Sequence, residues 1–408
     1  MPALIQPFRA IRPTARSAPD VAARPYDVVT AAEAREQAKG KPWSFLHVSR
    51  AEIDCPPGTD PYDSAVYTAA AQAFARMQAE GVLVREDLPA LYAYRMTAGS
   101  HVQTGIAAAA SIEAYESNRI RRHELTRPDK ERDRTRQIAA VGAHTGPVLV
   151  AHPPSEAVTN ALAAATAAPP IADATTVDGT RHQVWAITAP AAVEHLVGAF
   201  EAMPAIYIAD GHHRSAAAAR LVREGGAPAV DARFLIVSFP ADELHVLDYN
   251  RVVRDLAGLS GEAFLDRIAE TFAVAPAPAA CRPEKRGSFT MFLNGGWYRL
   301  DLRQPPSPDR PARERLDVSL LSEHLLTPVL GIGDPRTDPR IDFVGGGRGL
   351  AGLEERVRSG DAAVAFALYP TAFADVIAVA DAGDVMPPKS TWFEPKLADG
   401  LLSLPLAP

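Results

Sequence analysis

The sequence predicts an α+β protein, because strand-like and helix-like segments alternate along its 408 residues. Two apolar stretches, residues 91–97 and 101–110, flank Ala98 and Gly99 as the strands of a hairpin. Residues 62–81 place apolar side chains at helical spacing instead. A third region combines an apolar strand at 205–208, a polar turn, and an Ala- and Leu-rich helix at 215–224.

The elements before this third region are short. We expect strands at 7–13 and 25–30, and a helix at 31–38 with Thr30 as its N-cap. Residues 120–137 are dense in charge, and we expect them to begin as a loop and become helical near Asp129. Further expected elements are a strand at 148–150, a helix within 153–170, a strand at 183–187 and a helix at 191–202.

The remainder of the chain predicts a separate α+β region and an irregular tail. Its expected elements are strands at 233–239, 245–253 and 363–369, a hairpin turn at 294–296, and helices at 318–326 and 372–380. The tail at 386–396 is too polar and proline-rich for regular structure. Proline-rich stretches at 276–283 and 305–311 resemble linkers. We therefore expect three regions, which are 1–150, 151–274 and 284–408.

Composition narrows the class of protein. Hydrophobic residues make up 47% of the chain, which is enough for a large core. The net charge of −7 gives no general attraction to nucleic acid or to an anionic membrane. Cys55 and Cys281 are far apart and lack the spacing of a zinc or redox pair. With no apolar stretch of membrane-spanning length, these features favour a cytoplasmic protein.

The turn after the strand at 205–208 is the strongest candidate for chemistry. A strand that ends in Asp210 and passes through Gly211 into a helix places a carboxylate and backbone N–H groups at one edge of a sheet. His212, His213 and Arg214 add side chains that can donate hydrogen bonds to phosphate oxygens. We predict a phosphate-binding turn there. The alternative is a polar helix start with solvated histidines.

The run from Asp210 to Arg214 resembles the phosphate turn of the ParB and sulfiredoxin superfamily, which includes the free serine kinases. Several other motifs make the chain resemble, from end to end, a prokaryotic family of unassigned function often described as ParB-like. These motifs lie at 24–29, 44–48, 123–130, 340–346 and 389–396. The resemblance implies a ParB/sulfiredoxin-like nucleotide-binding core with large inserted and C-terminal α+β elements. It also implies phosphoryl transfer from ADP or ATP, with Mg²⁺, to a small hydroxyl compound.

The kinase resemblance leaves the base open. Serine kinases place a glutamate after their first strand, whereas this chain has Asp27 in the comparable region, with Glu124 as the second candidate. Ser215, Arg127 and Lys130 complete the predicted phosphate-binding set. The charge-rich segment that contains Arg127 and Lys130 has an equally good alternative as a solvated helix.

Two weaker candidates lie nearer the C-terminus. Lys389, Ser390 and Thr391 offer a charge and two hydroxyl groups for a substrate, or else belong to a structural tail. The glycines at 345–347 are a second, less specific phosphate turn, because no P-loop or dinucleotide-binding pattern surrounds them.

The preferred hypothesis is a small-molecule kinase, in which Arg214 and His213 hold the transferred phosphoryl group and Asp27 is the base. Two alternatives stay open. One is a ParB-like switch that binds or hydrolyses nucleotide without an acceptor. The other is a phosphatase or lyase that uses His212 as nucleophile or acid. The acceptor, the metal ligands and the oligomeric state are left open.

Overall fold

The computed structural model describes residues 3–226 and 232–406. They form two compact units, and one of them is interrupted by the other. Unit 1 comprises Met1–Leu244 and Pro395–Pro408, and unit 2 comprises His245–Glu394. These bounds differ from the three expected regions, because strands on both sides of residue 150 pair in one sheet of unit 1. The proline-rich stretches at 276–283 and 305–311 both lie inside unit 2, so neither separates the units.

Unit 1 is built on a nine-stranded mixed sheet of order β6-β11-β8-β12-β5-β4-β10-β9, with β1 paired to β5. Its strands are β1 (Ile5–Gln6), β4 (Leu91–Ala98), β5 (His101–Ser111), β6 (Ile120–Arg121), β8 (Val148–His152), β9 (Ala172–Thr175), β10 (Arg181–Ile187), β11 (Ile206–Asp210) and β12 (Arg233–Pro240). The central strands β5, β8 and β12 are buried along most of their length, as expected for strands covered on both faces. The hairpin predicted at Ala98 and Gly99 is confirmed by the pairing of β4 with β5.

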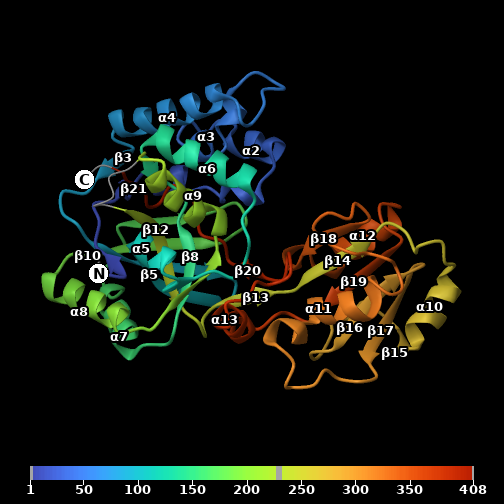
Figure 1. Ribbon diagram of the computed structural model, residues 1–408. Helices are drawn as coiled ribbons and strands as arrows, with labels where there is room; N and C mark the ends of the chain where they lie inside the picture. The colour runs from blue at the N-terminus through green and yellow to red at the C-terminus, as the bar shows by residue number, and fades with distance from the viewer. Residues whose placement is uncertain (1–2, 227–231, 407–408) are drawn as a thin grey trace. The chain divides into compact units, whose positions relative to one another are not determined.

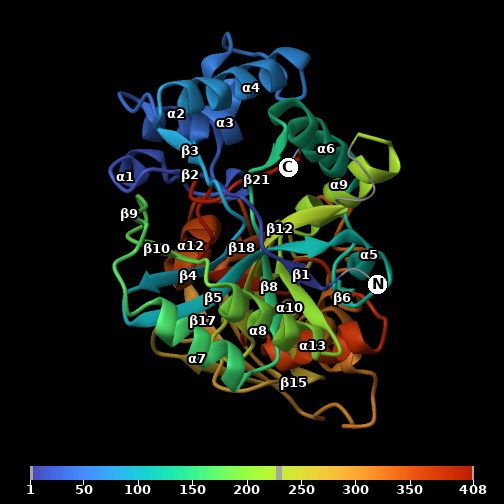
Figure 2. The same ribbon diagram turned by 90° about the vertical axis from the view of Figure 1, so that its left-hand side faces the viewer.

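Helices cover the two faces of this sheet (Figures 1 and 2). One side carries α7 (Glu156–Ala165) and α8 (Pro190–Glu201), which pack through residues such as Leu162 and Phe200 into the main apolar core. The other side carries α2 (Ala31–Ala38), α3 (Leu46–Ser49), α4 (Ser64–Ala79), α6 (Pro128–Val141) and α9 (His212–Arg223). A second apolar cluster lies among α2, α3 and α4. Unit 1 also contains α1 (Ala18–Val21), α5 (Ile112–Glu116), the 3₁₀ turns η1 (Tyr26–Val28) and η2 (Ala51–Asp54), and the short strand pairs β2 (Ile11–Pro13) with β3 (Leu83–Arg85) and β7 (Ala143–His144) with β21 (Leu404–Pro405).

Local sequence signals explain several of these elements. Helix α2 begins where predicted, because Thr30 accepts a hydrogen bond from the Glu33 N–H while the Glu33 carboxylate accepts from the Thr30 N–H. Helix α6 begins at Pro128, whose fixed φ suits the first turn of a helix. Residues 25–30, however, were expected to form a strand and contain the 3₁₀ turn η1 instead. Pro25 is extended there, and the chain turns after it so that Val28 N–H bonds to its carbonyl.

Unit 2 contains a six-stranded sheet of order β15-β17-β16-β19-β14-β18, in which every pair is antiparallel. Its strands are β14 (Tyr249–Val253), β15 (Phe272–Ala277), β16 (Ser288–Leu293), β17 (Gly296–Leu302), β18 (Ile341–Gly345) and β19 (Val364–Leu368). The helical segments are α10 (Gly261–Ala269), η4 (Ala312–Arg315), α11 (Asp317–Leu321), the π-helical turn η5 (Ser322–Leu326), η6 (Gly346–Arg348), α12 (Gly349–Arg358) and α13 (Phe373–Asp381). The tail is more regular than expected, because β20 (Trp392–Glu394) pairs with β13 (His245–Leu247). The α+β class is confirmed in both units.

The chain returns to unit 1 after β20. Asp399 and Ala23 exchange backbone hydrogen bonds of 2.9 and 3.2 Å, and Ser403 and Ile11 exchange bonds of 2.8 and 2.9 Å. The returning segment, residues 395–406, is largely buried. It is therefore part of the unit 1 core, and it brings new charged side chains to that unit.

Candidate active site

The corner between β11 and α9 has the geometry that the sequence predicts. Asp210 is the last residue of the strand and Gly211 is the N-cap of the helix, with φ of 100°. A Cβ at Gly211 would lie 3.1 Å from the Arg214 guanidinium and 3.3 Å from the Val148 Cα atom. The helix begins three residues earlier than expected, at His212, because Gly211 turns the chain at once. The helix has no side-chain cap, and within its first turn the Arg214 and Ser215 N–H groups donate to the Gly211 carbonyl at 2.9 and 3.1 Å.

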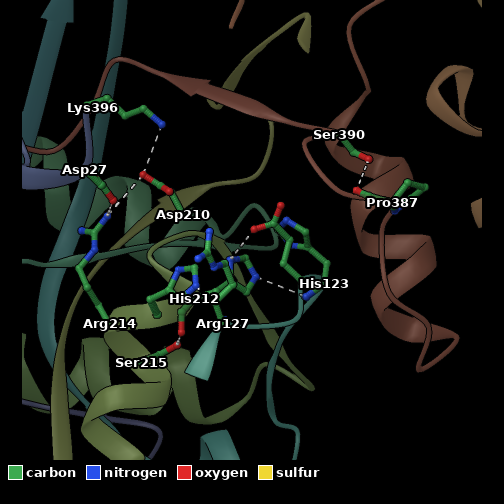
Figure 3. A network of polar contacts seen from close by, with 12 residues as sticks. Asp27, His123, Arg127, Asp210, His212, Arg214, Ser215, Pro387, Ser390 and Lys396 are labelled. Atoms are coloured by element: carbon green, nitrogen blue, oxygen red, sulfur yellow. Dashed lines mark hydrogen bonds and ion pairs between the residues drawn. The ribbon is translucent and has the colours of Figure 1, made fainter. Parts of the chain in front are cut away.

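Arg214 is at the centre of a buried ion network (Figure 3). Its NH2 atom lies 3.5 Å from the Asp27 Oδ2 atom and 3.5 Å from the Asp210 Oδ2 atom, and its NH1 group donates to the Pro147 carbonyl. The side chain is only 8% exposed. Burial alone would lower the pKa of Arg214, but the carboxylates of Asp27 and Asp210 outweigh it and raise the pKa. Arg214 therefore keeps its charge and links two carboxylates from distant parts of the sequence.

Lys396 extends this network from the returning segment. Its Nζ atom lies 3.4 Å from Asp210 Oδ2, and its side chain is 8% exposed. Burial would raise the pKa of Asp210, but the charges of Lys396 and Arg214 hold the pKa well below its ordinary value. Asp210 is thus an anion throughout the neutral range, between two buried cations. We define the charge cluster as Asp27, Asp210, Arg214 and Lys396.

Asp27 is the most accessible member of the charge cluster. It lies on η1, and its side chain is 36% exposed, whereas the two cations are 8% exposed. The preceding residue, Tyr26, fixes this turn, because its N–H donates to Asp399 Oδ2 at 3.2 Å and its ring lies 4.0 Å below the Arg134 guanidinium carbon. Asp27 is therefore a carboxylate that is held in place and still open to a ligand.

Asp399 is a buried carboxyl group beside Arg214. Its residue is 2% exposed, and its Oδ1 atom has no hydrogen-bond partner among the described residues. Burial raises the pKa of Asp399 to about 7, although the Arg214 charge acts in the opposite direction. This side chain can therefore exchange a proton near neutral pH. No motif in the sequence pointed to it.

The two histidines of the turn hold a neighbouring segment of the chain. The His123 N–H donates to His212 Nε2 at 3.4 Å, and the Arg127 N–H donates to His213 Nε2 at 3.1 Å. His212 is 4% exposed, and burial lowers its pKa to about 3, so its imidazole is neutral. Glu124 lies on the other side of this ring, with Oε2 3.8 Å from His212 Nδ1. His212 and His213, which we predicted to donate hydrogen bonds to phosphate, thus accept hydrogen bonds from the backbone of residues 123–127.

The other predicted phosphate ligands have local contacts. Ser215 is fully buried, and its hydroxyl donates to the His212 carbonyl at 3.0 Å. Arg127 is 70% exposed and pairs with Asp129 at 2.8 Å. Lys130 donates to the Tyr62 hydroxyl at 2.8 Å. None of these three contacts involves a member of the charge cluster.

Lys389, Ser390 and Thr391 belong to unit 2. Lys389 has φ of 56°, and its ammonium group lies 5.5 Å from the centre of the Tyr249 ring. Ser390 is 2% exposed and donates to the Pro387 carbonyl at 2.6 Å. The substrate contact that we predicted for these three residues stays a prediction.

The family of the chain follows from its sequence. The family model described as "Protein of unknown function (DUF1015)" matches residues 5–319. The chain belongs to this family. The match covers Asp27 and the β11–α9 corner and ends before Lys396 and Asp399, so two of the charged groups at the site lie outside the matched residues. No curated protein matches the sequence.

Three kinds of solved structure resemble this DUF1015 protein. A free serine kinase in complex with AMP is 15% identical, with a TM-score of 0.36, and the likeness covers 73% of this chain and 92% of the kinase. A conserved hypothetical protein from Pyrococcus furiosus is 14% identical, with a TM-score of 0.36 and coverage of 74% and 95%. SbnI from Staphylococcus aureus, truncated at its C-terminus, is 12% identical, with a TM-score of 0.39 and coverage of 74% and 88%.

Sequence reasoning identified half of the charge cluster by motif and missed part of the rest. Asp210 and Arg214 stand in one recognisable turn, and Asp27 was a candidate base. Lys396 is the last residue of the tail motif at 389–396, in which we predicted no role for this lysine, and Asp399 follows in a mostly apolar stretch. A buried charge between apolar residues is the signal that could have marked both, because a charge placed there needs a partner.

Two negative findings apply to residues 3–226 and 232–406. Those residues contain no group of three or more His, Cys, Asp or Glu side chains arranged to hold a metal ion. They also include no helix that is both long and apolar enough to span a membrane.

Proposed function

We propose that the protein transfers a phosphoryl group from ADP or ATP to a hydroxyl group of a small metabolite at the β11–α9 corner. The observation that carries this proposal is the convergence of Asp27 and Asp210 on one nitrogen of Arg214, each at 3.5 Å, at the start of a helix. Phosphoryl transfer needs positioning and charge neutralisation more than covalent chemistry, and this corner offers both.

The corner fits the phosphates of a nucleotide. The first turn of α9 offers N–H groups, and Gly211, which has no side chain, lets the Arg214 guanidinium lie close to the backbone of the turn, where an anion would meet both. Lys396 and Arg214 place two positive charges beside this turn. Mg²⁺, when bound with the nucleotide, would be held by the carboxylate of Asp210 and by phosphate oxygens, and it would neutralise negative charge on the transferred group.

Asp27 is the proposed base. It takes the proton of the acceptor hydroxyl while the acceptor oxygen forms a bond to the terminal phosphorus of the nucleotide. The bond between that phosphorus and the bridging oxygen breaks, and its electron pair stays with the shortened nucleotide. Arg214 holds Asp27 in position and supplies positive charge to the transferred group. The reaction therefore consumes one hydroxyl and yields one phosphate ester and one proton.

The test is product formation from ADP or ATP, Mg²⁺ and a set of hydroxyl metabolites, followed by ³¹P NMR. We expect a new phosphate ester with the wild-type protein. Asp27→Asn should lower turnover by about 10²- to 10⁴-fold, the usual contribution of a general base, while nucleotide affinity changes little. Asp20→Asn, which changes another exposed carboxylate of unit 1, should keep the wild-type rate.

Nucleotide binding is measured separately by calorimetry. A wild-type protein that binds neither ADP nor ATP would overturn the proposal, and so would Asp27→Asn turning over at the wild-type rate. Nucleotide hydrolysis without a phosphate ester would favour the ParB-like switch instead. A His212 phosphatase has less support, because that imidazole is 4% exposed and its Nε2 atom accepts the His123 N–H.

A further inference from the structure

Unit 1 contains a polar cavity of about 120 Å³ that the proposed chemistry does not use. Helix α6 supplies Lys130, Asp133, Arg134 and Gln137 to its wall. The remaining wall comes from residues of η1, the α3–η2 region and the start of α4, which are Tyr26, Ser49, Arg50, Ala51, Glu52, Pro61, Tyr62, Val66 and Tyr67. We call this space the α6 cavity. It is large enough for several water molecules or one compact ligand.

The charges around the α6 cavity do not balance. Arg50 pairs with Glu52 at 3.1 Å, and Arg134 pairs with Asp133 at 2.7 Å. Lys130 is the fifth charge, and in the part of the chain that the structure describes it forms no ion pair. Its ammonium group donates to the Tyr62 hydroxyl and lies 5.3 Å from the centre of that ring. Three cations against two carboxylates leave a surplus of one positive charge.

A buried hydroxyl in the same wall has no partner. Ser49 is 7% exposed, and its Oγ atom forms no hydrogen bond with any described residue. Buried hydroxyl groups are normally hydrogen-bonded, so an unpartnered one that lines a cavity indicates a ligand contact. Tyr67, by contrast, donates to Asp133 at 2.9 Å, and burial raises its pKa to about 12, so it stays a neutral phenol.

The α6 cavity also adjoins the candidate active site. A smaller cavity, lined by Arg214 and Asp399, shares four wall residues with it, which are Tyr26, Ser49, Arg134 and Gln137. The residue after Tyr26 is Asp27, the proposed base. The Tyr26–Arg134 pair is therefore part of the wall of both cavities.

We infer that the α6 cavity binds a small metabolite through a single carboxylate, with Lys130 and Ser49 as its hydrogen-bond donors. A monoanion neutralises the surplus charge, whereas a phosphate dianion would leave one negative charge without a partner in a mostly enclosed space. The inference rests on the proposed function in one respect only, which is that this carboxylate compound is the phosphoryl acceptor.

Binding is tested on the full chain by calorimetry with glycolate, 3-hydroxypropanoate and inorganic phosphate as probes, in the absence of nucleotide. We expect the hydroxy carboxylates to bind and phosphate to bind at least tenfold more weakly. Lys130→Ala should weaken carboxylate binding at least tenfold. Arg132→Ala, which removes an exposed positive charge from the same helix outside the cavity, should change it less than twofold.

Ser49→Ala provides a second variant that is expected to fold, because it removes a hydroxyl without a partner. It should weaken carboxylate binding at least threefold. Equal affinity of wild type, Lys130→Ala and Ser49→Ala for the carboxylates would overturn the inference, as would preferential binding of phosphate or no binding of either carboxylate. ADP or ATP binding, measured in parallel, reports on the β11–α9 corner, so a failure of the proposed function is distinguishable from a failure of this inference.

Discussion

Each unit contains a corner where a strand passes through glycine into a helical segment, and the two corners differ in what surrounds the glycine. In unit 1, Gly211 has positive φ and stands beside the Arg214 guanidinium. In unit 2, Gly345 ends β18, and a Cβ there would lie 2.7 Å from the Trp392 ring. A Cβ at Gly346 would lie 2.6 Å from Asp248 Oδ1. The first glycine is required by backbone conformation, and the other two by close packing.

This difference explains why one glycine turn is a candidate site and the other is not. The unit 1 corner gathers two partly exposed carboxylates around buried cations. The unit 2 corner is filled by Trp392 and Asp248, and the Gly346 N–H donates to the Asp248 carbonyl at 2.8 Å. The side chains there occupy the space that an anion would need. Glycine after a strand is therefore informative only together with the side chains that converge on it.

The largest expected contrast between the units is their response to acid. Among the residues that the structure describes, the five buried histidines all lie in unit 1, and their burial lowers each pKa to about 3 or 4; they are His123, His144, His152, His182 and His212. Unfolded histidine has a pKa of about 6.5, so the unfolded state binds more protons between the folded values and pH 6.5. The stability from these neutral imidazoles is complete above pH 6.5 and is lost as the pH falls below it. At pH 5, each of these histidines has lowered the free energy of unfolding by about 2 kcal/mol.

Two buried carboxyl groups have the opposite effect. Burial raises the pKa of Asp399 in unit 1 and of Asp317 in unit 2 to about 7, so each folded unit gains stability from its carboxyl group as the pH falls from 7 toward 4. Unit 2, all of whose residues the structure describes, buries no histidine to offset this gain. Hydrogen exchange of separate peptides at pH 7 and pH 5, corrected for intrinsic rates, should show protection lost in unit 1 and kept in unit 2. Equal losses in both units would contradict this contrast, and Asp317→Asn should remove the gain of unit 2.

The next largest effect is expected from the arginine that follows each glycine turn. Arg214→Ala should lower the free energy of unfolding by about 3–5 kcal/mol, because it removes the buried cation that the Asp27 and Asp210 carboxylates share, and it should abolish phosphoryl transfer. Arg348→Ala, at an exposed residue after the unit 2 turn, should change stability by less than about 0.5 kcal/mol. Urea unfolding followed by circular dichroism measures both. Similar losses of stability in the two variants would show that Arg214 contributes no more to the free energy of unfolding than an ordinary surface arginine.

The smallest effect sharpens the comparison of the glycines themselves. Gly345→Ala should cost about 1–3 kcal/mol through overpacking against Trp392, and should leave nucleotide affinity unchanged. Gly211→Ala should cost about 1–2 kcal/mol through its left-handed conformation, and should also weaken nucleotide binding. Thermal unfolding and calorimetric titration of the two variants separate these outcomes. Loss of nucleotide affinity in Gly345→Ala alone would reverse the roles that we give to the two corners.

Local elements of the fold were predictable because their causes are local. Thr30 caps α2 through groups three residues apart, and the β4–β5 hairpin turns at Ala98 and Gly99. The β11–α9 corner was also visible, because strand, turn and helix follow one another directly. The 3₁₀ turn at Tyr26 was mistaken for a strand, since its position depends on Asp399, which is far away in the sequence. The division into two units was not predicted for the same reason, because unit 1 combines the first part of the chain with a segment near its C-terminal end.

The site was predictable only where its residues are neighbours in sequence. Asp210 and Arg214 share one turn. The role of the adjacent histidines was less clear, because their ring nitrogens accept hydrogen bonds from residues that precede them by 89 and 86 positions in the sequence. Lys396 reaches Asp210 across 186 positions. Spacing within a sequence gives no information about such pairs. They depend on tertiary structure that brings an entire returning segment into place.

The return of the chain to unit 1 has a consequence for biosynthesis. A ribosome makes Asp210 and Arg214, then the whole of unit 2, and only afterwards Lys396 and Asp399. Until that moment the nascent corner has one cation beside two carboxylates, and η1 lacks the oxygen that accepts the Tyr26 N–H. The corner therefore reaches its final charge state late in translation, which keeps a partly made chain from having the finished site.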